Sequence, residues 1–193
     1  KWIEGLAHMT ALKVHCPNTH IVGVCDREAD VYDVFVAERA AGVDWLVRAA
    51  WNRGVKHPER YLWEAMQSVP AMATTQLHIP ARGSMGERTA EMTLRCAPVC
   101  IRPPSSRKGM GLADVDVNVI WAIETSPPKG VDPIEWMLLS SVPTHTLEQA
   151  LERLSWYARR WTIETWHRVL KSGCQIEARQ FGDGALGHAL VFL

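Results

Sequence analysis

The chain has 193 residues, of which 47% are hydrophobic and 22% are charged, and its 21 basic and 21 acidic residues cancel to a formal net charge of zero. Such a chain is long enough to bury one core together with an elaborated insertion, and its composition is ordinary for a globular protein. The neutral balance excludes a protein that is basic throughout, so any surface for nucleic acid must be local. No apolar run approaches the length of a membrane span, so we expect no membrane partner.

Five cysteines are scattered along the chain, at positions 16, 25, 96, 100 and 174. No secretory signal precedes them, which predicts reduced thiols in a cytoplasmic protein. Cys96 and Cys100 are close in sequence, but no second Cys/His pair at zinc spacing follows, so we expect no zinc site. The chain begins KWIEG, without methionine, and stops at HALVFL inside an apolar pattern. Both ends indicate a fragment of a longer protein.

The first quarter of the chain combines helical and strand patterns. An amphipathic helix is predicted over 2–14. It is followed by a buried strand, a helix that stops at a glycine, and a second apolar strand, over residues 21–26, 29–42 and 44–50. A strand, a helix and a strand within thirty residues form an α/β unit, most simply a parallel crossover.

The middle of the chain changes to strand patterns. A short helix around 61–67 precedes four segments in which β-branched and apolar residues alternate or run together: 74–80, 88–96, 96–104 and 114–124. Turn-forming stretches separate these segments, which predicts antiparallel sheet. Pro103 and Pro104 indicate an edge or an exit from that sheet.

The last part returns to core-like patterns. Residues 134–141 predict a buried strand, and Thr146 is expected to cap a long helix that ends at Gly173. The fold class is therefore α/β, with a core interrupted by a β-rich insertion. The expected segments are 1–55 and 134–193 for the core, and 56–133 for the insertion.

One face of the long predicted helix carries an acid among cations. At about 100° per residue, Tyr157, Arg160, Glu164 and Lys171 fall within an arc of roughly 60°, and Trp161 lies close to it. A solvated helix face with ion pairs four residues apart, each worth a few tenths of a kcal/mol, would look the same. The helix pattern alone leaves both interpretations open.

Asp26 adds a second acid at the end of a predicted buried strand, where α/β sheets gather their ligand-binding residues. A carboxylate there is costly unless Arg27, Arg48 or a divalent metal meets it. Metal binding is favoured if Glu164 arrives from a helix that packs on the same sheet. Two acids that hold Mg²⁺ beside phosphate-binding cations suit metal-assisted attack on a phosphodiester.

These residues carry a resemblance to a known family. The run VCDREADVYD and the pattern Tyr157-x2-Arg160-x3-Glu164-x6-Lys171 resemble the DDE transposases of bacterial insertion sequences, in the IS-four group with its Y-R-E-K signature. The segment PPKGVDPIEWMLLSSVP resembles the end of that group's β insertion. The resemblance implies a partial RNase H-like core interrupted by an antiparallel β-sheet insertion. It also implies cut-and-paste DNA transposition by two-metal phosphoryl transfer, with 3′-end nicking, hairpin formation and strand transfer.

The resemblance also implies roles for single residues. Asp26 matches the second catalytic acid and Glu164 the third, and together they would hold two Mg²⁺ or Mn²⁺ ions. The implied DNA contacts are Tyr157, Arg160, Lys171 and Trp136. Arg48, and Trp161 beside the helical stripe, are expected to be further DNA contacts. Trp136 resembles a tryptophan that stacks on a flipped base, although it could equally be a core residue of its strand. The implied partners are transposon-end and target DNA and a second copy in a homodimer, in the bacterial cytoplasm at the nucleoid.

The chain departs from the family pattern at one point. The family uses three acids, and the only acid before Asp26 is Glu4, in a predicted helix. We therefore expect this chain alone to be inactive. Two alternatives remain open: a metal-dependent nuclease on the same core, and a non-catalytic remnant that binds DNA in a salt-dependent way. Glu28 and Asp30 are expected to be structural, at the favourable end of a helix dipole.

Overall fold

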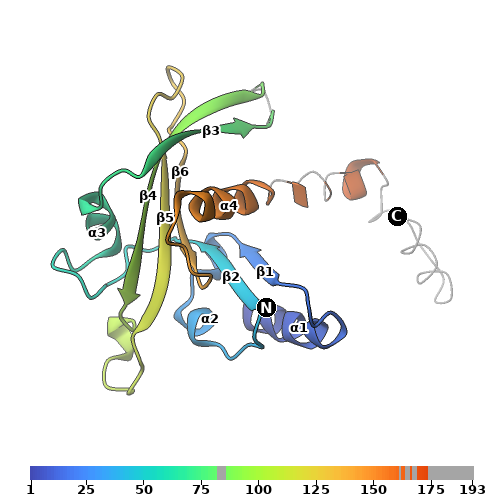
Figure 1. Ribbon diagram of the computed structural model, residues 1–193, viewed down its shortest axis with the longest axis vertical. Coiled ribbons are helices and arrows are strands. Elements are labelled where there is room, and N and C mark those ends of the chain that lie inside the picture. The colour runs from blue at the N-terminus through green and yellow to red at the C-terminus, as the bar shows by residue number, and fades with distance from the viewer. Residues whose placement is uncertain (82–85, 161, 164–165, 167–168, 174–193) are drawn as a thin grey trace. The chain divides into compact units, whose positions relative to one another are not determined.

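The computed structural model describes residues 1–81, 86–160, 162–163, 166 and 169–173. The chain divides into two compact units, Lys1–Tyr157 and Ala158–Leu193. The first unit is a mixed α/β structure, as predicted, and contains one six-stranded sheet (Figure 1). Its strands are β1 (Ile21–Cys25), β2 (Val43–Arg48), β3 (Ala73–Ile79), β4 (Arg88–Ile101), β5 (Val115–Glu124) and β6 (Glu135–Ser140). Its helices are α1 (Trp2–His15), η1 (Arg27–Ala29), α2 (Tyr32–Val36), α3 (Leu62–Ser68), η2 (Ser105–Arg107) and α4 (Leu147–Ala158).

The strands lie in the order β1-β2-β6-β5-β4-β3. β1 and β2 are parallel, with Cys25 opposite Val47, and all other neighbours are antiparallel. Both the predicted parallel crossover and the predicted antiparallel strands are confirmed. Because β6 pairs with β2 on one side and with β5 on the other, the strands within 56–133 continue the sheet that β1 and β2 begin.

The two faces of the sheet are covered by different helices. Side chains alternate between the faces along each strand. One face packs on Leu6 of α1, Phe35 of α2 and Leu62 of α3. The strand residues of that face include Trp45, Val47, Val119, Trp121, Met137 and Leu139. The other face carries the buried residues Leu46, Ile120, Trp136 and Leu138. α4 covers this second face, since Tyr157 contacts Trp136 (Figure 1).

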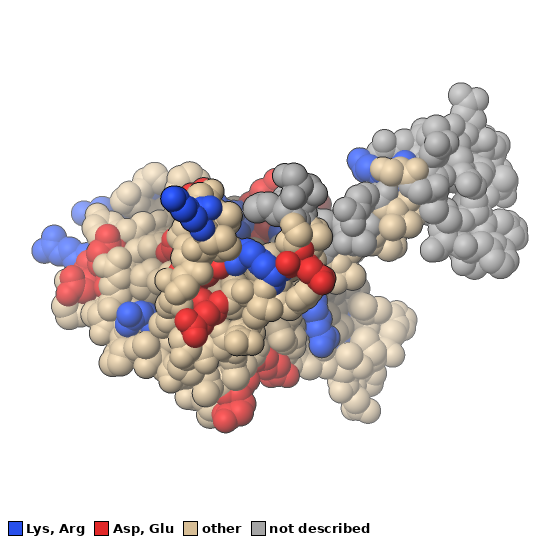
Figure 2. Space-filling view, turned by 90° about the horizontal axis from the view of Figure 1, so that it is seen from above, with Lys and Arg blue, Asp and Glu red and all other residues tan. Residues whose placement is uncertain are grey.

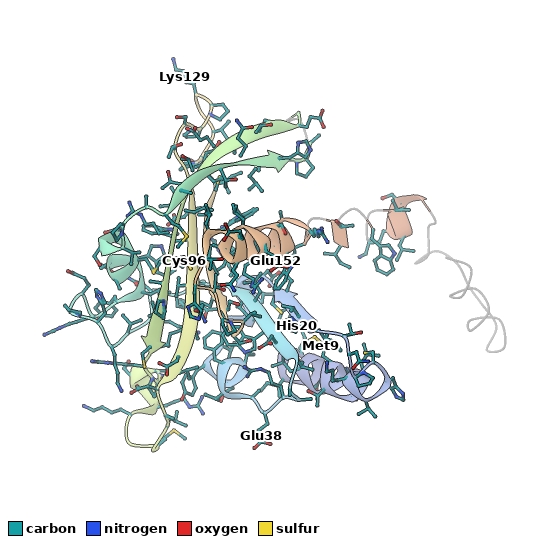
Figure 3. All side chains as sticks on the ribbon, viewed as in Figure 1. Met9, His20, Glu38, Cys96, Lys129 and Glu152 are labelled. Atoms are coloured by element: carbon teal, nitrogen blue, oxygen red, sulfur yellow. The ribbon has the colours of Figure 1, made fainter. Side chains whose placement is uncertain are left out.

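Gly23 shows which face of β1 packs against α1. A Cβ atom at Gly23 would lie 2.7 Å from Cε of Met9, the flexible end of a side chain of α1. Met9 of α1 is labelled beside β1 in Figure 3. Gly23 therefore faces α1, and Val22 and Val24 face the opposite side of the sheet. By the same alternation Asp26, in extended conformation at φ −83° and ψ −166°, continues the α4 face.

Two predicted elements in the first unit differ from the structure. The segments 88–96 and 96–104 form one strand, β4, that runs through Pro98. β3 pairs with β4 only as far as Leu94, so Pro98, which lacks an N–H group, lies where β4 is an edge strand. The helix predicted over 29–42 is shorter, because α2 ends at Val36. Tertiary contacts replace its last turns: the backbone N–H of Ala40 donates to Thr10 Oγ1 at 3.4 Å.

The long helix predicted to reach Gly173 is also interrupted. α4 ends at Ala158 and a turn follows. Beyond it Ile163, Trp166 and Val169 are each about half exposed, at 48%, 51% and 53%. Residues 162, 163 and 166 are helical again, so the turn at 159–160 interrupts the predicted helix. Within the described part of the chain, no helix combines the length and the apolar character needed to cross a membrane.

Candidate functional site

Asp26 lies directly after β1, at the carboxyl edge of the parallel pair β1–β2. It caps η1, and its Oδ1 accepts a hydrogen bond from the backbone N–H of Glu28 at 3.1 Å. The side chain is half-buried. Among the described residues, no hydrogen bond or ion pair engages Oδ2, so neither Arg27 nor Arg48 neutralises this carboxylate there.

Arg48 lies beside Asp26 across the strand pair. Because Cys25 of β1 is opposite Val47 of β2, the residues that follow them, Asp26 and Arg48, are level with each other. The half-buried guanidinium of Arg48 donates from Nη2 to the backbone carbonyl of Glu135 at 2.8 Å. This bond aligns the arginine along the carboxyl edge of the sheet rather than toward Asp26.

Trp136 and Tyr157 lie on the same face and at the same edge as Asp26. Trp136 is the second residue of β6 and lies next to the end of β2, where the Ala49 N–H donates to the carbonyl of Met137 at 2.7 Å. The rings of Trp136 and Tyr157 meet edge to face, with centroids 4.8 Å apart at 71°. Both side chains are buried, at 4% and 3% exposed. A DNA contact through either one requires a rearrangement that exposes it, so these roles stay predictions.

The other predicted residues fall in the second unit or outside the described residues. Arg160 is half-buried and Lys171 is exposed, the latter in a π-helix over Val169–Gly173. Glu164 and Trp161 lie outside the described residues. The structure therefore joins Asp26, Arg48, Trp136 and Tyr157 at one edge, and the roles predicted for the remaining residues are untested.

A magnesium site at Asp26 would need further ligands. In the described ranges, no three His, Cys, Asp or Glu side chains cluster closely enough to hold a metal ion. Mg²⁺ usually takes one or two carboxylates and completes its shell with water and substrate phosphates. Asp26 suits one such ligand position, because its carboxylate has an oxygen that no described group engages.

Asp30 has a structural role that the sequence did not specify. Its side chain is 0% exposed, and its carboxylate accepts bonds from the N–H groups of Ala50 and Trp51, at 2.7 and 2.9 Å, and from Arg53 Nε at 2.7 Å. It was expected to be structural, and it is, through hydrogen bonds rather than through a helix dipole. No sequence signal identifies these partners, because Arg53 is 23 residues away.

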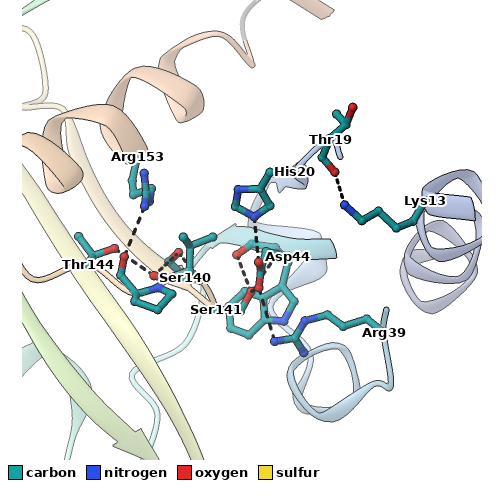
Figure 4. A network of polar contacts seen from close by, with 12 residues as sticks. Lys13, Thr19, His20, Arg39, Asp44, Ser140, Ser141, Thr144 and Arg153 are labelled. Atoms are coloured by element: carbon teal, nitrogen blue, oxygen red, sulfur yellow. Dashed lines mark hydrogen bonds and ion pairs between the residues drawn. The ribbon is translucent and has the colours of Figure 1, made fainter. Parts of the chain in front are cut away.

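A second polar cluster lies at the opposite edge of the sheet (Figure 4). Asp44 accepts from Ser141 Oγ at 2.6 Å and lies 2.9 Å from His20 Nε2, and Arg39 is 3.7 Å away. Burial raises the pKa of Asp44, but the bonds from Ser141 and His20 and the charge of Arg39 outweigh it, so this pKa lies below its ordinary value. A nucleophilic serine needs the histidine between serine and acid. Here Asp44 lies between Ser141 and His20, so the cluster is not arranged for a nucleophilic serine. Its contacts instead connect β2 with the residues that precede β1 and follow β6.

The thiol of Cys25 reports on the charge of Asp26. Burial raises the pKa of Cys25 to about 11, and the Asp26 carboxylate adds to the rise. Only the thiolate reacts with alkylating reagents, so Cys25 should react slowly below that pH. Asp26→Asn removes the charge but not the burial, so its alkylation rate at pH 9 is expected to rise, by less than about tenfold.

Alkylation by iodoacetamide, followed by peptide mass spectrometry over pH 7–10, measures this rate. Glu28→Gln is the matched control, because Glu28 pairs with Lys1 at 3.0 Å instead of contacting the thiol, and its rate should equal that of the wild type. Equal rates in Asp26→Asn and the wild type would contradict the expected electrostatic coupling.

Charges on the visible face of the protein are mixed. In Figure 2, Lys and Arg side chains are interspersed with Asp and Glu side chains. This agrees with a formal net charge of zero and indicates that any attraction for a polyanion is local. A comparison of the chain with models of known protein families finds no match.

Proposed function

We propose that this chain carries part of the catalytic core of a DDE transposase with an RNase H-like fold, and that Asp26 is one of its metal-holding acids. The observation that carries the proposal is the state of Asp26. Its carboxylate lies at the carboxyl edge of a parallel strand pair, and no described cation neutralises it, whereas Asp30, four residues on, is fully engaged. The Y-R-E-K signature and the run DREAD support the same reading.

The described residues would act by holding and positioning DNA. Arg48, whose guanidinium is held by the Glu135 carbonyl at the same edge of the sheet, would supply a positive charge for the DNA backbone. Tyr157 and Trp136 would contact the DNA end once exposed, and Arg160 and Lys171 would bind its phosphates. Two Mg²⁺ or Mn²⁺ ions, when bound, would activate the attacking oxygen and stabilise the leaving one. In strand transfer a 3′-hydroxyl forms a new P–O bond, and the displaced 3′-oxygen of the target strand leaves.

The 193-residue chain by itself is proposed to bind DNA without cleaving it. Glu4, the only acid before Asp26, belongs to α1, which packs on the opposite face of the sheet. Its carboxylate is exposed and lies 2.9 Å from the amino group of Lys1. The described contact of Glu4 is therefore with Lys1 and does not place this acid with Asp26 at one metal.

The test is a cleavage and joining assay on the longer protein that the resemblance implies, with Mg²⁺ or Mn²⁺ and DNA that carries the element's end. Hairpin products and strands joined through a 3′-hydroxyl are expected, and chelation of the metal should abolish both. Hydrolysis without joining would indicate a nuclease instead. Salt-dependent DNA binding without any metal-dependent product would indicate the non-catalytic alternative.

A further inference from the structure

An exposed tryptophan lies beyond the same edge of the sheet as Asp26. The side chain of Trp51 is 66% exposed, although tryptophan is highly buried on average. Within the described ranges, no hydrogen bond or ring contact engages its indole. The predicted stacking residue Trp136 is only 4% exposed. Trp51 is therefore the tryptophan at this edge that presents a ring to solvent.

The backbone of Trp51 is fixed although its side chain is exposed. Asp30 accepts from the N–H groups of Ala50 and Trp51, and its carboxylate also binds Arg53. Asp30 ends the short turn that Asp26 begins. The buried carboxylate thus fastens the Trp51 loop to the Asp26 turn. Because the backbone of Trp51 is already ordered, a ligand that stacks on the ring has only the side chain left to immobilise.

The spacing suits one nucleic acid strand that touches both groups. Asp26 is level with Arg48, and Trp51 follows Arg48 by three residues, a reach of at most about 10 Å. Arg27 follows Asp26 and is exposed, so a cation stands at the same edge. A flat π-surface beside cations is the arrangement that binds single-stranded DNA, because every base can stack on it.

We propose that Trp51 is a stacking platform for an unpaired nucleobase, within a few nucleotides of the phosphodiester at Asp26. This inference rests on the proposed function for its placement beside a scissile phosphate. Stacking itself requires no metal and no cleavage, so the 193-residue chain should show it.

The test uses a fluorescein-labelled single-stranded dT15 oligonucleotide and the full 193-residue chain, with binding followed by fluorescence anisotropy at several salt concentrations. Trp51→Ala is expected to weaken binding about 5- to 150-fold, the range that loss of one stacked base gives. Trp51→Phe should retain most of the affinity, because it keeps an aromatic face. The salt dependence should be the same in all three proteins, since no phosphate contact is removed.

Val14→Ala is the matched control. Val14 is 78% exposed on α1, which covers the opposite face, and its replacement should not change the affinity. Circular dichroism on each variant checks that the fold is retained. Wild-type affinity in Trp51→Ala, equal losses in Trp51→Ala and Trp51→Phe, or no binding of dT15 at low salt would each overturn the inference.

The outcomes separate this inference from the proposed function. Trp51-dependent binding of dT15, with no joined products from the longer protein, would support the stacking role of Trp51 and contradict the proposed transposase function. Joined products from the longer protein, with full dT15 affinity in Trp51→Ala, would support the transposase function and contradict the stacking role.

Discussion

The strand transfer proposed for the longer protein is expected to fall by about 10³-fold or more when Asp26 is replaced by alanine, with DNA binding nearly unchanged. Loss of a metal ligand removes several kcal/mol of transition-state stabilisation, and about 4 kcal/mol corresponds to 10³ in rate. The fold should survive, because the one hydrogen bond that the Asp26 side chain makes in the described chain is the cap to Glu28 N–H, worth about 1 kcal/mol. Single-turnover joining of labelled end DNA measures the rate.

Two further variants separate the charge of Asp26 from its capping role. Asp26→Asn keeps an oxygen that can cap η1 but loses the negative charge. It should therefore be as inactive in strand transfer as Asp26→Ala, and its free energy of unfolding should be higher than that of Asp26→Ala. Glu28→Ala removes an exposed acid two residues away that pairs with Lys1, and should join DNA at the wild-type rate. A wild-type rate in Asp26→Asn would exclude Asp26 as a catalytic acid.

The second large effect concerns stability rather than chemistry. Asp30→Ala is expected to lower the free energy of unfolding by about 3–5 kcal/mol, the usual cost of breaking a buried ion pair. The change leaves Arg53, 11% exposed, without its carboxylate, and it leaves the N–H groups of Ala50 and Trp51 unpaired. Urea denaturation of the 193-residue chain, followed by circular dichroism, measures the loss.

An exposed ion pair in the same region provides the matched control. Asp33 pairs with Arg107 at 2.9 Å, but the two side chains are 42% and 31% exposed. Asp33→Ala should therefore cost no more than about 1 kcal/mol. A double-mutant cycle of Asp30→Ala and Arg53→Ala isolates the coupling between those two residues. A loss of less than about 1 kcal/mol for Asp30→Ala would contradict the structural role assigned to it.

Short apolar runs bounded by turn residues were sufficient to predict β1, β2 and their parallel crossover, because local patterning determines such strands. The position of Asp26 at the end of β1 followed directly. The pairing of Asp30 with Arg53 did not, since it joins residues 23 apart in the chain. Sequence patterns indicate that a carboxylate is present but not which distant groups will meet it.

The end of α4 shows a second limit. Apolar periodicity continues past Ala158, so the pattern predicts one helix through to Gly173. In the structure residues 159–160 form a turn, and residues 162, 163 and 166 are helical again beyond it. The shared helical face proposed for Tyr157 and Lys171 therefore lacks the continuous helix on which it was based.

The position of β6 bears on how the protein can be divided. β6 exchanges hydrogen bonds with β2 on one side and with β5 on the other, so residues 56–133 are joined to the rest through backbone as well as through the core. Excising them would strip one whole edge of β6 and leave its amides open to aggregation. For the same reason, β2, β6 and β5 should open as one cooperative unit, so their amide hydrogen-exchange rates should change together when the protein is destabilised. The segment 56–133, which the sequence pattern suggests is an insertion, contributes three of the six strands of a single sheet and is expected to fold with it.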